Sequence, residues 1–154
     1  MATRWMGGVL AGLCFFVLIV FGCDSITTTP KTADCTSVAD TTQPATLSYA
    51  NDIVPLFSPT KYNCGDQGCH ASNLPGLTEY RMGSYDELFD QASEAHQAGM
   101  CEIKPGDPDQ SYMFWKVEGH SGIQGVRMPK DRPAMSSADL QLLRQWILEG
   151  ARNN

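Results

Sequence analysis

Two cysteines and a histidine lie close together in the segment Cys64-Gly-Asp-Gln-Gly-Cys69-His70. Two thiols with a short spacer, followed directly by an imidazole, are the groups that attach a haem covalently. The thiols add across the porphyrin vinyl groups, and the imidazole reaches the iron. The usual spacer has two residues, and here it has four. We expect Gly65 and Gly68 to provide the positive-φ freedom that lets the two extra residues bulge outward.

Two other interpretations of these residues remain open at the level of the sequence. The first is a disulfide loop with a solvated histidine beside it. The second is a metal such as zinc, although a closed zinc site takes four ligands in paired spacings and the sequence has no second pair of that kind. The adjacency of Cys69 and His70, together with the residues that follow, favours haem.

Residues 1–22 have the pattern of a signal peptide. Arg4 gives a short basic start, and the uncharged apolar run over residues 7–21 is shorter than a membrane span needs. The run ends in Val20-Phe21-Gly22-Cys23, which resembles a bacterial lipoprotein cleavage site, where the cysteine becomes the lipidated first residue. An uncleaved N-terminal anchor is the alternative. Either way we expect an exported chain tied to a membrane, on the periplasmic side or at the cell surface.

Residues 23–46 are rich in threonine, carry Pro30 and Pro44, and show no helical or strand period. This composition predicts a flexible tether. Cys35 lies inside it, and a lone thiol is uncommon in an oxidising compartment. Cys101 is the remaining unassigned cysteine of the exported chain, so we expect a Cys35–Cys101 disulfide, worth roughly 4 kcal/mol in the chain-entropy treatment. Pairing of Cys35 with Cys64 or Cys69 belongs to the interpretation without haem.

Residues 47–154 are expected to fold as one all-α domain of about four short helices, because no stretch alternates as a strand would. Each helix has a start signal: Ser48, the Ser84–Glu87 capping box, Asp107 before Pro108, and Ser136 with Asp139. Pro55 is expected to bend or end the first helix, and Gly150 to end the fourth. The expected inner faces are Tyr49, Ile53, Leu56 and Phe57; Tyr85, Leu88, Phe89 and Ala92; Met113, Phe114 and Val117; and Leu140, Leu143, Trp146 and Ile147.

Between the third and fourth helices lies a glycine-punctuated loop, from which we expect a second iron ligand. Met128 is followed by Pro129, which stiffens the backbone, and a thioether opposite an imidazole favours ferrous iron. Met135 and His120 are the alternative ligands. Packing in the core is the common fate of any single methionine, and for Met128 it is the alternative to ligation.

The order of these features resembles the class I cytochrome c superfamily, and it is more closely similar to monohaem cytochrome c-like domains of exported, lipid-anchored bacterial proteins. The residues that carry the resemblance are the Cys-His loop, the Pro105-Gly-Asp-Pro108 turn, the Arg-Met128-Pro loop and the terminal Trp146-Ile-Leu-Glu-Gly-Ala helix. It covers about residues 47–152. The resemblance implies one haem c, thioether bonds at Cys64 and Cys69, and His70 and Met128 as axial ligands.

A protein with both axial positions filled by its own side chains is expected to be a one-electron carrier rather than an enzyme. The sequence contains no nucleophile elbow, phosphate loop or dinucleotide fingerprint. Its net charge of −6 argues against nucleic acid and is compatible with a redox partner protein. Two alternatives remain: a haem enzyme or gas sensor with His96 or His120 as distal base, and a cofactor-free, disulfide-held interaction module. Arg127 and Lys130 are candidates for pairing with haem propionates.

Overall fold

The computed structural model describes residues 33–35, 44–66, 68–71, 80–90 and 92–154. All regular elements within these ranges are helical, as expected for an all-α domain, and the one bridge between extended residues joins Cys101 and Ser111. The expected signal peptide, residues 1–22, the expected lipidation site Cys23 and most of the expected tether lie outside the described residues. No helix in the described part of the chain has the length and apolarity needed to cross a membrane.

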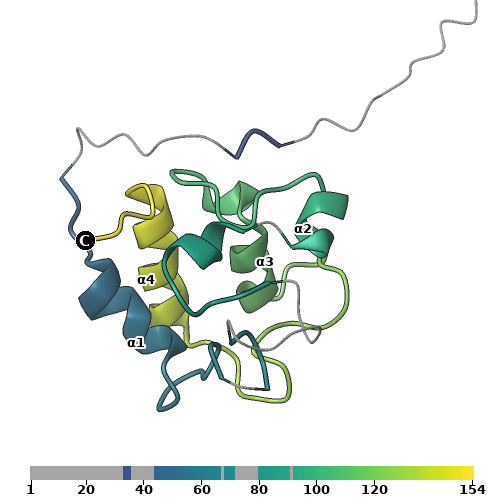
Figure 1. Ribbon diagram of the computed structural model, residues 1–154, viewed down its shortest axis with the longest axis horizontal. Helices are drawn as coiled ribbons and strands as arrows, with labels where there is room; N and C mark the ends of the chain where they lie inside the picture. The colour runs from purple at the N-terminus through teal and green to yellow at the C-terminus, as the bar shows by residue number, and fades with distance from the viewer. Residues whose placement is uncertain (1–32, 36–43, 67, 72–79, 91) are drawn as a thin grey trace, which may run out of the picture.

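The elements follow the chain in a simple order (Figure 1). They are a π-helical turn Tyr49–Ile53, α1 Val54–Phe57, a 3-10 turn Asp86–Phe89, α2 Ser93–Gln97, a 3-10 turn Pro108–Gln110, α3 Tyr112–Glu118 and α4 Ser137–Leu148.

The longest helix, α4, has the expected start and inner face. The Ser136 hydroxyl accepts a hydrogen bond from the backbone N–H of Asp139 at 3.2 Å, a cap that typically contributes about 1 kcal/mol. Leu143, Trp146 and Ile147 are no more than 1 % exposed. We therefore find the fourth helix where the sequence predicts it.

The first helical segment packs against α4, and the end of the chain returns to it (Figure 1). The rings of Tyr49 and Trp146 stack with their centroids 5.6 Å apart. The N–H of Ala50 donates to the carbonyl of Asn154 at 3.2 Å, and the carboxylate of Glu149 accepts from the N–H of Leu47 at 3.1 Å. The residues from Leu47 onward are therefore held by the last residues of the chain.

The second helix differs from the expectation of one helix running from Ser84 through Ala92. The capping interactions form: the Ser84 hydroxyl accepts from the Glu87 N–H at 3.3 Å, and the Glu87 carboxylate accepts from the Gly83 N–H at 2.9 Å. The 3-10 turn nevertheless ends at Phe89, and α2 starts separately at Ser93.

The break has a tertiary cause. Asp90 and Ala92 are extended, with ψ of 122° and 157°. In this position the Ala92 N–H donates a hydrogen bond to the buried carboxylate of Glu102. A contact with a residue ten positions later in the chain thus competes with continued helix, and local periodicity does not reveal it.

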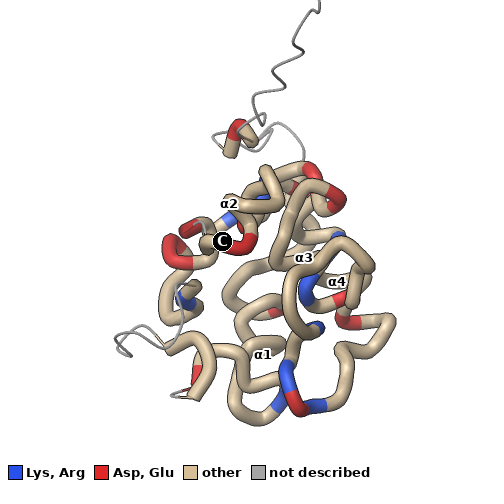
Figure 2. Tube along the Cα trace, turned by 90° about the vertical axis from the view of Figure 1, so that its right-hand side faces the viewer, with Lys and Arg blue, Asp and Glu red and all other residues tan. Residues whose placement is uncertain are grey.

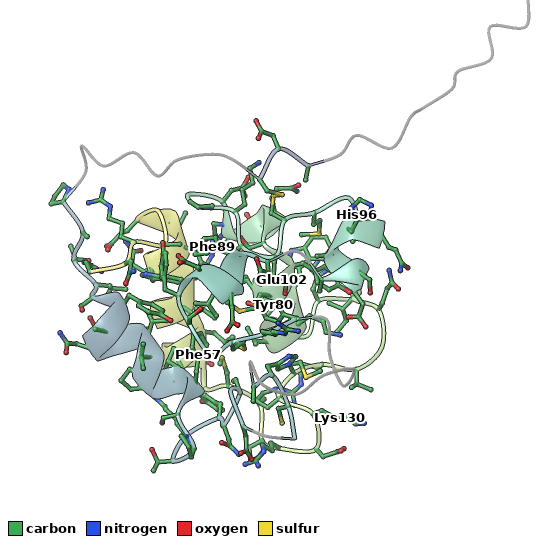
Figure 3. All side chains as sticks on the ribbon, viewed as in Figure 1. Phe57, Tyr80, Phe89, His96, Glu102 and Lys130 are labelled. Atoms are coloured by element: carbon green, nitrogen blue, oxygen red, sulfur yellow. A yellow bond between two sulfur atoms is a disulfide. The ribbon has the colours of Figure 1, made fainter. Side chains whose placement is uncertain are left out.

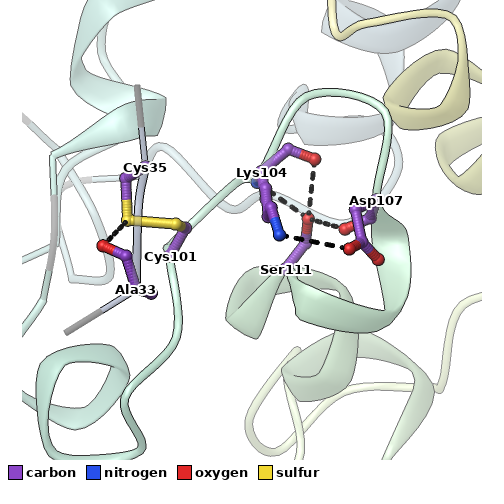
Figure 4. The surroundings of a disulfide bond; sticks show 6 residues. All are labelled: Ala33, Cys35, Cys101, Lys104, Asp107 and Ser111. Atoms are coloured by element: carbon purple, nitrogen blue, oxygen red, sulfur yellow. Dashed lines mark hydrogen bonds and ion pairs between the residues drawn. A yellow bond between two sulfur atoms is a disulfide. The ribbon is translucent and has the colours of Figure 1, made fainter. Parts of the chain in front are cut away.

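The third helix is also divided, at Ser111. Asp107 caps the first turn by accepting from the Gln110 N–H at 3.2 Å, as expected. Ser111 is fully buried, and its hydroxyl accepts from the Lys104 N–H at 2.9 Å and donates to the Asp107 carbonyl at 2.8 Å (Figure 4). These hydrogen bonds hold Ser111 in an extended conformation, so α3 begins at Tyr112, the residue after it. The expected inner residues Met113, Phe114 and Val117 are buried.

Cys35 and Cys101 form a disulfide, which confirms the pairing expected from the sequence (Figure 4). Their Cα atoms are 5.4 Å apart, and they are separated by 66 residues in the chain. Cys101 is 1 % exposed and directly precedes Glu102. The tether is therefore joined covalently to the interior of the domain at residue 35.

Candidate haem site

The four residues expected to hold a haem line one cavity of about 450 Å³: Cys64, Cys69, His70 and Met128. The rest of its wall is mainly apolar and aromatic and includes Phe57, Tyr80, Met82, Tyr112, Met113 and Val117. Ligand pockets of roughly this volume, apolar with a few placed polar groups, are typical of bound cofactors. Residues 64 positions apart in the chain are thus brought to a common space by the packing of α1, α3 and the loop before α4.

The segment that carries the two cysteines is held as a compact turn. The Cys69 N–H donates to the Asp66 carbonyl at 2.8 Å, and the His70 N–H donates to the Cys64 carbonyl at 3.1 Å. The two ends of the four-residue spacer are therefore linked by the backbone itself, which shortens the span between the cysteines.

The expected role of the two glycines in this turn is wrong. Neither Gly65 nor Gly68 has positive φ; among the described residues of this turn the left-handed one is Asn63, with φ of 55°. Asparagine tolerates this region because its short polar side chain bonds locally, and here its Nδ2 donates to the Asp66 carboxylate at 2.8 Å. Gly65 instead lies close to another backbone segment, since a Cβ there would be 3.4 Å from the Met82 carbonyl oxygen.

Cys64 and Cys69 are both thiols, joined neither to each other nor to Cys35. Burial raises the pKa of the Cys64 thiol to about 11, and the neighbouring Cys69 raises it further, while Arg132 acts in the opposite direction. Cys64 is therefore protonated at neutral pH. Such a thiol oxidises slowly, because the thiolate is the reactive form.

His70 is oriented by a backbone carbonyl. Its Nδ1 lies 2.9 Å from the carbonyl oxygen of Tyr80, and the two rings meet edge to face. With the proton on Nδ1, the ring donates to this oxygen and its Nε2 is left as an acceptor for a metal. Tyr80 was not predicted from the sequence. No pattern points to it, because the contact uses a carbonyl that every residue possesses.

Met128 is attached to α3 through its backbone. Its N–H donates to the Lys116 carbonyl at 2.8 Å. Of the three second-ligand candidates, Met128 alone lines the cavity. Met135 is 4 % exposed in the apolar core, and His120 stacks on Trp115 with centroids 3.8 Å apart.

Two further methionines, Met82 and Met113, also line the cavity, which sequence reasoning did not anticipate. Met82 is bonded through its N–H to the carbonyl of His70 at 2.8 Å. Met113 belongs to the inner face of α3 and was expected only as a core residue. Thioethers therefore reach this space from three different segments.

Of the two charged residues expected at the cavity, Lys130 lines it and Arg127 does not. Lys130 lines it and points toward the periphery of the molecule (Figure 3), whereas the Arg127 guanidinium donates to the carbonyl of its neighbour Met128 at 3.2 Å. Lys116 also lines the wall, and its ammonium group is 2.8 Å from the Glu94 carboxylate. His96 does not line the cavity; it lies on α2, at the periphery of the molecule (Figure 3).

Glu102 also lines the cavity, and the sequence did not predict this. It is 3 % exposed, and burial raises the pKa of its carboxyl to about 7. Glu94 raises this pKa as well, while the Ala92 N–H and Lys116 lower it. A single glutamate in a loop carries no sequence signal, because only the fold decides whether it is buried.

Comparison of the chain with protein-family models, with curated proteins and with solved structures gives no match. Among the described residues, no three His, Cys, Asp or Glu side chains come together as the ligands of a metal ion would.

Proposed function

We propose that this chain binds one haem c covalently and carries single electrons at a membrane surface, in a cytochrome c-like all-α fold. The observation that supports this most is the meeting of Cys64, Cys69, His70 and Met128 at one cavity of about 450 Å³. These are two thiols for the vinyl groups and two axial ligands of the kinds found in electron-carrying cytochromes.

The residues of the cavity fit a haem in three respects. Cys64 and Cys69 are not part of a disulfide, and their sulfur atoms are of the kind that forms thioether bonds. His70 has one ring nitrogen engaged by a backbone carbonyl, the arrangement common for metal-bound histidines. The mainly apolar wall suits a porphyrin face.

The cofactor supplies the one-electron chemistry, and the protein supplies attachment, orientation and the local electrostatics. Cys64 and Cys69 would hold the porphyrin, and His70 and Met128 would be the iron ligands, which would leave no position open to a substrate. The Tyr80 carbonyl keeps the His70 imidazole from rotating. The chain is accordingly a carrier rather than an enzyme.

Export and lipidation at Cys23 complete the proposal and would keep the carrier at the membrane, where donor and acceptor proteins are found. In the described part of the chain, acidic residues are distributed around the whole trace (Figure 2). The net charge of −6 therefore does not single out one docking face.

The direct test is production of the full chain in a bacterial host with haem c maturation, followed by denaturing electrophoresis and a haem stain. We expect haem that survives denaturation in the wild type and is lost in the C64A/C69A double variant. The matched control is C35S/C101S, which removes the other cysteine pair of the domain and should retain the stain.

Each other outcome has a defined meaning. Colourless wild-type protein from a competent host would contradict the proposal and favour the cofactor-free module. Covalent haem with a high-spin spectrum that binds carbon monoxide would contradict the carrier function, because the sixth position would be open to ligands.

A further inference from the structure

Glu102 places a buried carboxyl group, one of whose oxygens has no hydrogen-bond partner among the described residues, on the wall of the cavity. The residue is 3 % exposed and lines the cavity, and its Oε2 atom is buried with no hydrogen-bond partner among the described residues. Figure 3 shows it in the interior of the domain, near Tyr80. A buried carboxylate without a full set of partners is costly, so this group readily accepts a proton when its surroundings become more negative.

The charges around Glu102 do not neutralise it. Glu94, on α2, is a like charge that raises the pKa of Glu102. Lys116, on α3, lowers this pKa, but its ammonium group is also bonded to Glu94 and to the Gln124 carbonyl, each at 2.8 Å. Lys130 and Arg132, on the loop before α4, line the same cavity. Glu102 also lies near Tyr80, whose phenol is neutral at physiological pH because burial raises its pKa. The partner that remains is the Ala92 N–H.

We propose that Glu102 is a proton-binding site coupled to the redox state of the haem, an inference that rests on the proposed function. When a donor protein supplies one electron to the haem, the Glu102 carboxylate gains affinity for a proton, and in part of the molecules it binds one from solvent and becomes a carboxylic acid. Reoxidation by the acceptor lowers the affinity again and releases that proton to solvent. The proton offsets the added negative charge most near the pH at which Glu102 titrates.

The physical reason is that the electron adds a negative charge inside the same low-dielectric space. A unit charge across a cavity of this size, at an effective dielectric constant of about 20, changes proton affinity roughly tenfold. Because the two equilibria are linked, reduction strengthens proton binding by the same factor by which protonation favours reduction. The midpoint potential should therefore be constant at low and high pH and fall with rising pH between these limits.

The experiment is a spectroelectrochemical titration of the full chain between pH 5 and pH 9. For the wild type we expect the midpoint to fall by about 59 mV in total, the equivalent of a tenfold change in proton affinity for a one-electron couple. In E102Q, which has the same shape and no titrating proton, the fall should disappear.

The matched control is E94Q. Glu94 is a neighbouring carboxylate that is far more exposed, and it contacts Lys116. E94Q should keep the full fall but move it to lower pH, because the like charge that raises the pKa of Glu102 is gone. A fall that persists unchanged in E102Q would overturn the inference and point to another group, such as a propionate.

A second measurement covers the case in which E102Q does not fold. The infrared difference spectrum of the wild type, reduced minus oxidised at pH 7, should contain the C=O stretch of a newly protonated carboxylic acid, and ¹³C-glutamate labelling should shift it. Absence of that band from protein with covalent haem would overturn the inference while leaving the proposed function intact. Loss of covalent haem itself would instead contradict the proposed function.

Discussion

The Nδ1 atom of His70 lies 2.9 Å from the carbonyl oxygen of Tyr80, and the Tyr80 hydroxyl donates a hydrogen bond to the Leu88 carbonyl at 3.1 Å. The imidazole beside the cysteine turn is thus oriented by a residue ten positions later, which is itself anchored in the core at 7 % exposure. Groups that hold the far nitrogen of a metal-binding histidine tune both its orientation and its basicity.

Replacement of Tyr80 by phenylalanine removes the anchor and keeps the ring. We expect Y80F to lower the free energy of unfolding by about 1 kcal/mol, the usual value of one hydrogen bond, and to shift the midpoint potential because the His70 imidazole is held less firmly. Urea denaturation and a redox titration measure the two effects.

Tyr85 provides the matched control for this variant. Its hydroxyl donates to the Ala151 carbonyl at 2.6 Å, and it does not line the cavity. Y85F should therefore cost similar stability without moving the potential. Equal potentials in Y80F, Y85F and the wild type would show that Tyr80 does not control His70.

Under the proposed function, replacement of Met128 should remove the sulfur ligand of the haem iron. We expect M128A to lose the weak sulfur-to-iron band of the oxidised protein and to bind carbon monoxide when reduced. M135A should retain the band while losing about 2–5 kcal/mol of stability, because Met135 is packed in the core. Loss of the band in M113A or M82A, with retention in M128A, would assign the ligand to another wall of the cavity.

Removal of the disulfide should destabilise the domain without affecting haem attachment. For the C35S/C101S variant we expect the free energy of unfolding to fall by about 4 kcal/mol, since the bond closes a loop between residues 66 positions apart. Urea denaturation monitored by tryptophan fluorescence measures this loss. An unchanged denaturation midpoint would mean that the tether contributes nothing to the folded domain.

The carboxylate of Glu149 should make stability depend on pH in the acid range. Burial acts to raise its pKa, but hydrogen bonds from Thr46, Gln145 and Leu47 outweigh this and lower the pKa to about 2. A depressed pKa means that the stabilisation is present above the ordinary value of about 4.5 and is lost as the pH falls toward 2.

In E149Q this part of the pH dependence should be absent. Because the group is exposed to solvent, we expect it to contribute no more than about 1 kcal/mol. Thermal unfolding at pH 6, 4 and 2.5 tests this: the wild type should lose more stability over the series than E149Q does. An equal loss of stability in both proteins would show that the Glu149 carboxylate does not stabilise the domain through its bonds to Thr46 and Leu47.

The local sequence was sufficient to predict features that depend on residues close together in the chain. The Ser136 cap and the apolar stripe of α4 were predictable because both follow helical periodicity, and the Cys35–Cys101 bond was predictable because few cysteines were left to pair. The predicted second and third helices were wrong in their continuity. Glu102 and Ser111 interrupt them through contacts with distant or buried partners that periodicity does not encode.

For the site itself, the sequence alone determined the adjacent groups Cys64, Cys69 and His70 and the class of ligand to seek. Only the tertiary structure decided that Met128 reaches their cavity while Met135 packs in the core, that the Tyr80 carbonyl orients the imidazole, and that Glu102 is buried. The physical reason is that exposure and approach across a cavity depend on how α1, α3 and α4 pack. That packing sums many weak contacts between residues far apart in the chain.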